Sequence, residues 1–320
     1  MRENQKPRFI SQSTQRFIEE ARQTDGYSLY DFLHGYIYAR WPYLYIGIGT
    51  GEHPLPKILN PILIGLAKLL HYLPANNNNL DITPNDEKTV TFAEKYHGKV
   101  IPLKSAEQLV TVRQEVNLPN LEHVIPYNHA RDIILQDPDH IIALKCPCRG
   151  ARPDPCKPLD VCLIVGEPFA GFILEHHPKK ARAISPIEAV DILQQEHDRG
   201  HVHHAFFKDA MLGRFYAICN CCSCCCGAMQ AHRNGTPMLA SSGYIISVES
   251  STCIGCGSCE EFCQFDAIQI CGDVAVVDVD ACMGCGVCED KCDQGALSLN
   301  RDDSKAEPLV LSDLIAAQKV

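Results

Sequence analysis

The sequence predicts an α+β protein, with mixed α/β N-terminal and cysteine-rich middle regions followed by a small C-terminal metal-binding module. Helical and strand-like apolar patterns alternate over the first 245 residues, 19 of the 320 residues are Cys, and one cysteine pattern occurs twice near the C-terminus. A chain of this length has room for two or three domains. The predicted divisions are residues 1–80, 81–245, 246–300 and a tail at 301–320.

The first region is rich in apolar and aromatic residues. Arg16–Gln23 is expected to form a short helix, and Leu55–Leu73 is the most apolar stretch of the chain. That stretch is a poor membrane span, since a span needs about 20 mostly apolar residues and polar residues interrupt this one. On a helical wheel the polar residues form one stripe, which suits packing in the core, contact with a partner, or a place in a membrane interface. A turn-prone run at 75–80 marks the predicted boundary.

The middle region alternates helix and strand patterns. Ser105–Gln114 is a helix candidate, and the apolar run Ile141–Leu144 is expected to be a buried strand that leads into Cys146. The clearest helix is Ser185–His197, and Gly200 lies just beyond its end.

Several residues of this last helix have specific expected roles. Ser185 suits the N-cap, Pro186 the first helical position, and Glu188 a capping box. The face expected to be buried contains Ile187, Val190, Leu193 and Gln194.

The number of cysteines calls for either disulfides or metal ligation. Disulfide frameworks are typical of small secreted domains, and residues 1–20 lack the apolar stretch of a secretion signal. A cytoplasmic protein, with a possible membrane association through Leu55–Leu73, is therefore expected. Reduced thiols at metal-ligand spacing favour clusters.

The repeat has the spacing C-x2-C-x2-C-x3-C, which recurs 29 residues later with two glycines at matching positions. A [4Fe–4S] cubane needs four thiolates, and in such runs the fourth cysteine binds the other cluster. The expected ligands of the first cluster are Cys253, Cys256, Cys259 and Cys292; those of the second are Cys282, Cys285, Cys288 and Cys263. A double zinc site is the alternative, although zinc sites use paired cysteines farther apart.

Residues 247–300 resemble the bacterial-type ferredoxins with two [4Fe–4S] clusters. The resemblance implies paired hairpins and helices, low-potential clusters and one-electron transfer. Gln264 and Asp293 stand where that family usually has Pro after the fourth cysteine, which changes turn rigidity and cluster solvation. Cys271, outside both motifs, is expected in the core as a small apolar residue.

Ten further cysteines lie in the middle region in two groups. The first group is expected to bind a third metal centre, most simply iron–sulfur, and contains Cys146, Cys148, Cys156 and Cys162. The second group is expected to supply ligands to that centre, to hold an unusual cluster or to include redox-active thiols, and contains Cys219, Cys221, Cys222, Cys224, Cys225 and Cys226. Prolines stiffen the loop around Cys156 and lower the entropy lost on closing it around a metal, and Arg149 is placed to offset cluster charge. A structural zinc ion and redox-active thiols are the alternatives.

The order of these motifs over residues 125–300 resembles a group of 4Fe–4S dicluster-domain proteins of anaerobes. That resemblance implies electron transfer in anaerobic metabolism and no defined reaction.

The net charge of −10 is concentrated at the C-terminal end, where residues 247–320 contain 14 acidic and 4 basic side chains. This distribution argues against a nucleic-acid partner. It suits docking to a basic patch on a redox partner, or it serves solubility alone.

Histidines at 176, 177, 197, 201, 203 and 204 suggest metal ligation or proton relay, or a solvated helix end. No phosphate-binding loop or hydrolytic nucleophile motif is present in the sequence. The predicted function is an iron–sulfur electron carrier or redox-complex subunit. The alternative is an oxidoreductase whose 146–226 cysteine centre reduces a disulfide or another small substrate.

Overall fold

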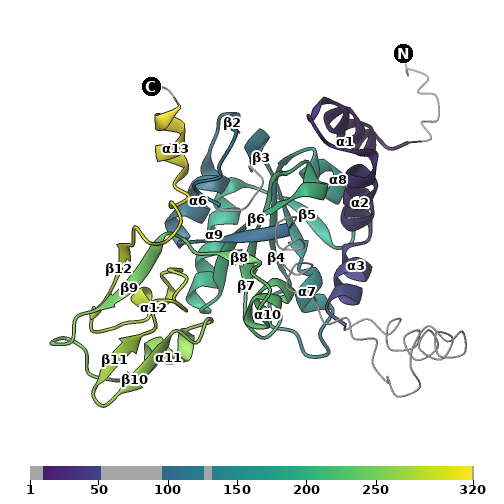
Figure 1. Cartoon of the computed structure of the whole chain (residues 1–320). Coiled ribbons are helices and arrows are strands. Elements are labelled where there is room, and N and C mark those ends of the chain that lie inside the picture. Colours follow the sequence, from purple (N-terminus) through teal and green to yellow (C-terminus); the bar gives the residue numbers. More distant parts are fainter. Residues whose placement is uncertain (1–9, 52–95, 126–131, 319–320) are drawn as a thin grey trace, which may run out of the picture.

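A mostly antiparallel sheet of eight strands forms the centre of the molecule in the computed structural model, which describes residues 10–51, 96–125 and 132–318 (Figure 1). The strands are β1 (Tyr96–Ile101), β2 (Val116–Leu118), β3 (Ile133–Lys145), β4 (Asp160–Glu167), β5 (Ala181–Ile184), β6 (Val202–Lys208), β7 (Arg214–Cys221) and β8 (Leu239–Ala240). Their order is β2-β3-β4-β7-β6-β1-β8, and β5 also pairs with β3. Only the β1–β8 pair is parallel among these described pairings. The mixture of helices and strands confirms the predicted α+β class.

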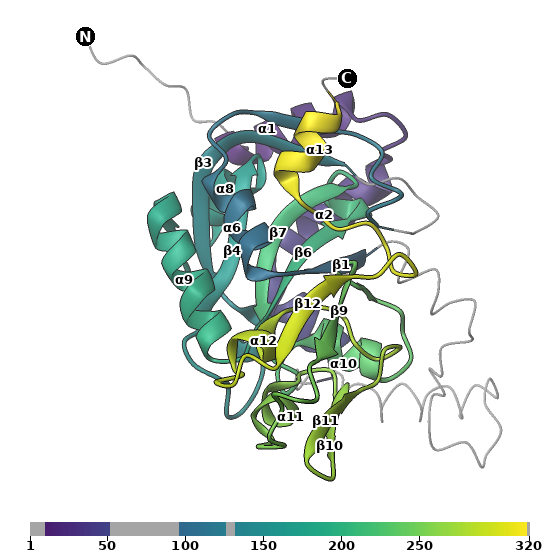
Figure 2. The ribbon, with the colours of Figure 1, turned by 90° about the vertical axis from the view of Figure 1, so that its left-hand side faces the viewer.

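Helices cover both faces of this sheet because its strands alternate apolar side chains between two cores. On β3, Ile142 and Leu144 belong to one core, whereas Ile141 and Ala143 belong to the other. The first core is covered by α1 (Gln12–Gln23), α2 (Leu29–Arg40), α3 (Pro42–Gly49), α7 (Pro147–Gly150), α8 (Phe169–His176) and α10 (Gly227–Arg233). The second is covered by α6 (Leu103–Thr111), α9 (Pro186–Asp198) and α13 (Leu311–Ala317), which Figure 2 shows in front of the sheet.

Residues 244–301, here called the C-terminal module, form a separate small unit below the sheet (Figure 2). Its elements are β9 (Tyr244–Val248), α11 (Ser258–Phe262), β10 (Ile268–Cys271), β11 (Val274–Val277), α12 (Val287–Asp290) and β12 (Leu297–Arg301). β9 pairs with β12 and β10 with β11, both antiparallel. The module has its own core, and Met283 and Val287 also join the first core of the main sheet. The module is therefore docked on the larger body.

The predicted elements are present with adjusted bounds. The helices expected at Arg16–Gln23 and Ser105–Gln114 are α1 and α6, and the strand expected at Ile141–Leu144 is the end of β3. The helix expected at Ser185–His197 is α9, with Ser185 as N-cap and Pro186 in the first turn.

Two details predicted for α9 are wrong. Ile187 is 75% exposed and Gln194 is also exposed, whereas Glu196 and His197 are buried. The reason is that α9 presents a polar side to the interior, where Glu196 pairs with Arg149. Glu188 does not complete a capping box. Its amide donates to Ser185 Oγ, but its carboxylate pairs with Arg182 at 2.5 Å.

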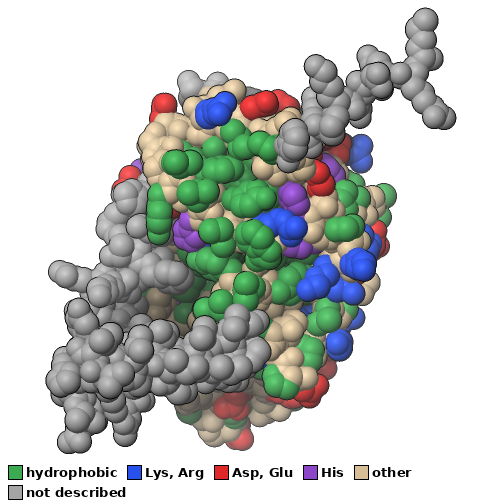
Figure 3. Space-filling view, turned by 90° about the vertical axis from the view of Figure 1, so that its right-hand side faces the viewer, with side chains coloured by type: hydrophobic (Ala, Val, Ile, Leu, Met, Phe, Trp, Pro, Cys, Tyr) green, Lys and Arg blue, Asp and Glu red, His purple; other side chains and the backbone are tan. Residues whose placement is uncertain are grey.

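The first helices present an apolar stripe to solvent (Figure 3). The exposed large side chains are Leu29, Tyr30, Leu33, Ile37, Trp41, Leu44 and Ile48. Their spacing follows the outer side of α2 and α3. Leu55–Leu73 and the boundary at 75–80, predicted nearby in sequence, lie outside the described residues. Within the described ranges, no helix has the length and apolarity needed to cross a bilayer.

Candidate metal centres

The two cysteine repeats of the C-terminal module have the same local conformation. Gly255 and Gly284 both have φ of +63°, and Gly257 and Gly286 precede α11 and α12 with φ of +88° and +84°. Only glycine adopts such angles without strain. A Cβ on Gly284 would also lie 2.1 Å from the Tyr244 carbonyl oxygen. The glycines therefore allow the backbone of each loop to turn tightly between its three cysteines.

One cavity of about 20 Å³ in the module is lined by Cys253, Cys256, Cys259 and Cys292. These are the four cysteines predicted for the first cluster, so the structure brings the last cysteine of the second repeat to the loop of the first. Ile254, Ile270 and Leu297 add an apolar lining, which would shield a cluster from part of the solvent.

The other four cysteines also lie close to one another. The pKa of Cys285 is raised to about 12, mainly by burial, and the neighbouring thiols of Cys263 and Cys282 contribute to this rise. Burial likewise raises the pKa of Cys288, with Cys285, Cys263 and Cys282 adding to the effect. The structure thus groups Cys263 with the second repeat, as the predicted exchange of the fourth ligand requires.

Backbone amides point at the cysteine sulfurs in both halves of the module. Ala267 N donates to Cys263 Sγ at 3.2 Å, and Ala296 N donates to Cys292 Sγ at 3.3 Å. Ala275 N donates to Cys253 Sγ at 3.4 Å. Such bonds stabilise thiolate charge and tune the potential of a bound cluster. The thiols, the cavity and the amide donors therefore fit two cubanes, which would supply one-electron chemistry.

The ten cysteines of the middle region fall into two adjoining sets. The inner set contains Cys146, Cys148, Cys162, Cys219, Cys221 and Cys226, and the outer set contains Cys156, Cys222, Cys224 and Cys225. The inner six line a cavity of about 70 Å³, and Cys222 and Cys225 of the outer set contribute to its wall.

Strand pairing explains the inner set. Cys162 on β4 lies directly opposite Cys219 on β7, so both side chains point to the same face of the sheet. Cys221, two residues along β7, lies on that face as well. Cys146 is at the end of β3, next to β4. Three adjacent strands therefore direct thiols into one chamber.

Three tyrosines line the chamber beside apolar side chains such as Leu144 and Met211. Tyr38 and Tyr216 share a hydrogen bond of 2.9 Å between their hydroxyls, and Tyr96 also lines the cavity. Burial raises the pKa of all three tyrosines well above the ordinary value, so they are neutral donors at physiological pH. They were missed from the sequence because nothing near residues 38 and 96 resembles a metal-site motif.

Arg149 is the buried cation between the two cysteine sets. Its amide donates to Cys146 Sγ at 3.5 Å, and its guanidinium donates to Glu196 Oε2 at 2.6 Å and to the Asn220 carbonyl oxygen at 3.0 Å. Its charge also lowers the pKa of Cys222, although burial and neighbouring thiols raise that pKa overall. The guanidinium thus lies near thiols of both sets, but its charge is paired with that of Glu196, so a role of Arg149 in offsetting cluster charge stays a prediction.

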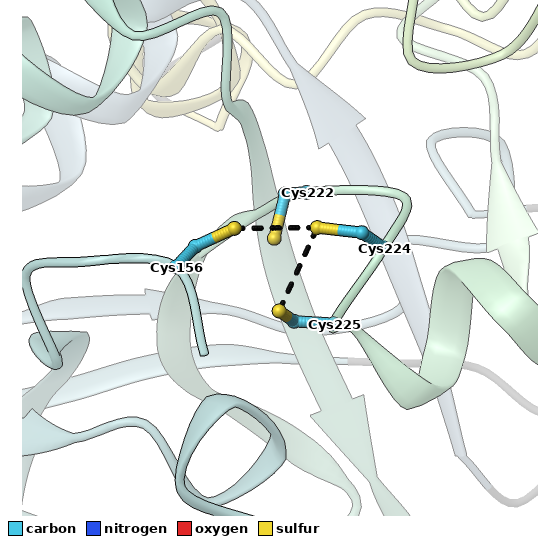
Figure 4. Close-up of side chains that lie close together, drawn as sticks. All are labelled: Cys156, Cys222, Cys224 and Cys225. Atoms are coloured by element: carbon cyan, nitrogen blue, oxygen red, sulfur yellow. Dashed lines mark hydrogen bonds between the residues drawn. The ribbon is translucent and has the colours of Figure 1, made fainter. Parts of the chain in front are cut away.

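The outer set is the tightest group of thiols in the described residues. Its four Sγ atoms all lie within 4.8 Å of one another (Figure 4). Cys156 Sγ is 3.2 Å from Cys224 Sγ, which is 3.6 Å from Cys225 Sγ. Cys224 is exposed and Cys156 half-buried, whereas Cys222 and Cys225 are buried. This group faces the surface on one side.

A hydrogen bond joins the outer set to the C-terminal module. Ser223 N, between Cys222 and Cys224, donates to Gln264 Oε1 at 2.8 Å. Gln264 directly follows Cys263. The bacterial-type ferredoxins that this part of the chain resembles usually have Pro at this position. The unusual residue therefore has a structural role, which is to connect the two cysteine-rich parts.

The structure corrects the predictions made for Cys271 and for four of the histidines. Cys271 is exposed rather than in the core, because it ends β10 on the same face as exposed Gln269, opposite to buried Ile268.

The histidines 197, 201, 203 and 204 are buried rather than at a solvated helix end. His197 Nε2 lies 2.6 Å from Asp290 Oδ2, His201 Nδ1 lies 2.7 Å from Glu196 Oε2, and His203 Nδ1 lies 2.6 Å from Asn220 Oδ1. These contacts tie α9 and β6 to the module and to β7.

Comparison with known proteins bears on the C-terminal module. Residues 246–269 and 275–298 each match the 4Fe–4S binding domain family. No curated protein and no solved structure matches the chain. The two matching domains carry two [4Fe–4S] clusters, and they give this chain an iron–sulfur electron-transfer role.

Proposed function

We propose that this protein is a one-electron carrier, or a subunit of a redox complex, in which the two clusters of the C-terminal module exchange electrons with a centre at the 146–226 cysteines. The observation that carries the proposal is the Ser223–Gln264 hydrogen bond. It connects a residue next to a second-cluster ligand with the cysteine run after β7. Anaerobic metabolism is the proposed setting, on the resemblance of the motif order to proteins of anaerobes.

A cleft between the module and the main body gives a partner access to the second cluster. It has a volume of about 850 Å³, and Cys285, Glu289 and Asp290 lie in its wall together with Lys104 of α6. Most of the charge around it is acidic, as it is over the module as a whole. A redox protein with a basic patch is therefore the proposed partner.

The ligand assignment has a direct test. In Cys256→Ser, the first cluster should be lost or altered, and the electron paramagnetic resonance spectrum of the reduced protein should lose the signal of one cluster. Cys271→Ser is the matched control, because Cys271 is another exposed cysteine of the same module that lies outside both motifs. An unchanged spectrum in Cys256→Ser would refute the assignment.

Metal counting under anaerobic conditions tests the centre in the middle region. The module alone accounts for eight irons. A count of twelve or more supports an additional iron–sulfur cluster there, whereas a count of eight excludes one.

A second candidate function is favoured by the enclosed chamber itself. A cavity of about 70 Å³ lined by six thiols and three tyrosines suits a reaction centre, in which a disulfide would take up two electrons and two protons to give two thiols. Oxidation of the reduced protein by a small disulfide, without any partner protein, would support this function. Oxidation only by a partner protein would favour the carrier.

A further inference from the structure

We infer that the outer set, Cys156, Cys222, Cys224 and Cys225, binds a single metal ion in tetrahedral thiolate coordination. This site adjoins the six-cysteine chamber, whose wall includes Cys222 and Cys225, and it shares no ligand with the clusters of the module. The binding of this ion does not depend on the direction in which electrons flow.

The distances favour one ion rather than a cubane. A tetrahedral ion with metal–sulfur bonds of about 2.3 Å places its four sulfurs about 3.8 Å apart. The measured contacts of 3.2 Å and 3.6 Å, and the 4.8 Å limit on all pairs, bracket that value. A cubane holds its thiolates farther apart, because each sulfur binds a different corner iron.

The C-terminal module provides an internal comparison. Among the described residues, none of its eight cluster cysteines falls into a group of three or more ligand atoms within 4.8 Å. The loops that hold cubanes thus leave more space between their thiols than the outer set does. The same chain therefore distinguishes two kinds of cysteine site.

The chain around the outer set is organised to hold this geometry. Cys226 N and Cys225 N both donate to the Cys222 carbonyl oxygen, at 3.0 Å and 3.3 Å, which closes a helical turn around three of the ligands. Arg152 belongs to the loop that brings Cys156. Its guanidinium bonds to Gln230 Oε1 at 2.5 Å, and Gln230 Nε2 donates to the Cys224 carbonyl oxygen at 2.9 Å.

These contacts act as supports that orient ligands from two distant segments. Supports of this kind are regular features of protein metal sites. They hold the Cys156 loop against the turn from outside the thiol group.

The donor set defines the class of metal. Four thiolates select soft or borderline ions that accept a tetrahedral arrangement, namely Zn²⁺ or Fe²⁺, and disfavour Mg²⁺ and Ca²⁺. Binding of a divalent ion to four thiols releases four protons and leaves a site of charge −2. Two cations lie near that charge: Arg149 interacts electrostatically with Cys222, and the Arg152 guanidinium lies 3.5 Å from the Cys225 carbonyl oxygen.

The test is a metal count on the full chain purified without oxygen, for the natural sequence and for Cys224→Ser. The exposed position of Cys224 makes this the least disruptive ligand substitution. The variant should lose one zinc or one iron per chain and keep both clusters of the module. Cys271→Ser should lose nothing.

X-ray absorption gives the second measurement, either at the zinc edge or as the difference between the iron-edge spectra of the natural sequence and Cys224→Ser. Four sulfur neighbours at about 2.3 Å with no neighbouring metal would support the inference. Loss of about four irons in Cys224→Ser, a metal–metal distance at this site, or a Cys156–Cys224 disulfide in the anaerobic protein would overturn it. Because the clusters of the module are counted separately, failure here leaves the proposed electron transfer untouched.

Discussion

At the junction between the module and the sheet, one side chain makes a hydrogen bond that joins the two parts of the molecule. Gln264 occupies a position where a ferredoxin turn would need only a rigid Pro, and it uses that position to accept a hydrogen bond from Ser223 N. A half-buried backbone N–H that loses its acceptor costs about 1 kcal/mol or more. The residue therefore influences the run of cysteines that follows β7 as well as its own loop.

Gln264→Ala should leave both clusters in place and loosen the turn at 222–226. A loss of about 1 kcal/mol corresponds to roughly fivefold faster exchange of the Ser223 amide. Hydrogen exchange followed by mass spectrometry measures this directly, with exposed Gln269→Ala as the control. Unchanged exchange at Ser223 would show that the bond has no role in solution.

His140 and Glu167 form a pH-dependent contact between β3 and β4, with 2.6 Å between Nδ1 and Oε1. The hydrogen bond with Glu167 raises the pKa of His140 above its ordinary value of 6.5. Burial raises the pKa of Glu167, but the hydrogen bond and charge of His140, together with the charge of Arg16, outweigh burial and lower that pKa below 4.5. The stabilisation from His140 is thus complete below pH 6.5 and is lost as the pH rises through the raised pKa.

His140→Ala should accordingly lower the melting temperature more at pH 6 than at pH 9. The contribution from Glu167 is lost only at acid pH, below its lowered pKa, so it does not reverse this trend. A partly exposed pair contributes up to about 1 kcal/mol, or roughly 1–3 °C for a chain of this size. His123→Ala, at an exposed position, is the control. Equal losses at both pH values would contradict the expected linkage.

Among the secondary-structure elements, α9 connects the two parts of the molecule. Its buried side contributes Glu196 to Arg149 and His197 to Asp290 of the module. At its last residue, Lys291 Nζ donates to the Asp198 carbonyl oxygen at 2.9 Å, and just beyond the helix the ring of Phe262 packs on Gly200. The end of this helix is therefore a docking point for the C-terminal module.

Gly200→Ala should weaken that docking. Gly200 has φ of +80°, and a Cβ there would lie 2.5 Å from Phe262 Cδ1. Gly213 is a matched control, since it has φ of +65° and no atom within 4 Å of an added Cβ. Both substitutions incur about 1–2 kcal/mol of backbone strain, but only the first also displaces Phe262.

Limited proteolysis distinguishes the two variants. The module should be cleaved from the main body faster in Gly200→Ala than in Gly213→Ala at equal overall stability. Equal cleavage rates would mean that the ring of Phe262 moves aside without cost.

On the scale of the whole molecule, charge is divided unevenly. The excess of acidic side chains lies after residue 246, in the part that carries the two clusters. Clusters with thiolate ligands add further negative charge to the same end. The field around the module should therefore attract cationic reactants and repel anionic ones.

Reduction by a cationic viologen should slow severalfold when the ionic strength is raised from 0.01 M to 0.15 M, over which the screening length falls from about 30 Å to about 8 Å. Reduction by anionic dithionite should accelerate over the same range, and a neutral mediator should show little change. Stopped-flow absorbance of the clusters measures all three rates. A salt dependence with the opposite signs would contradict the steering role of the acidic surface.

The features that could be predicted from the sequence are those that depend on short spacing. These features are the two cysteine runs with their glycines, the N-cap at Ser185 and the end of the same helix before Gly200. Each acts over a few residues, so its geometry can be inferred from the order of residues alone. The grouping of Cys292 with the first repeat could also be expected, because in runs of this spacing the fourth cysteine binds the other cluster.

How distant segments meet became clear from the folded structure. The division of the ten middle cysteines into an inner and an outer set depends on the pairing of β4 with β7 and on the return of the Cys156 loop to the turn at Cys222. The exposure of Cys271 and Ile187, and the burial of Glu196, depend on which face of each element the rest of the chain covers. Such choices are made by long-range packing and by buried charge pairs, whose partners are tens of residues apart and leave no local pattern in the sequence.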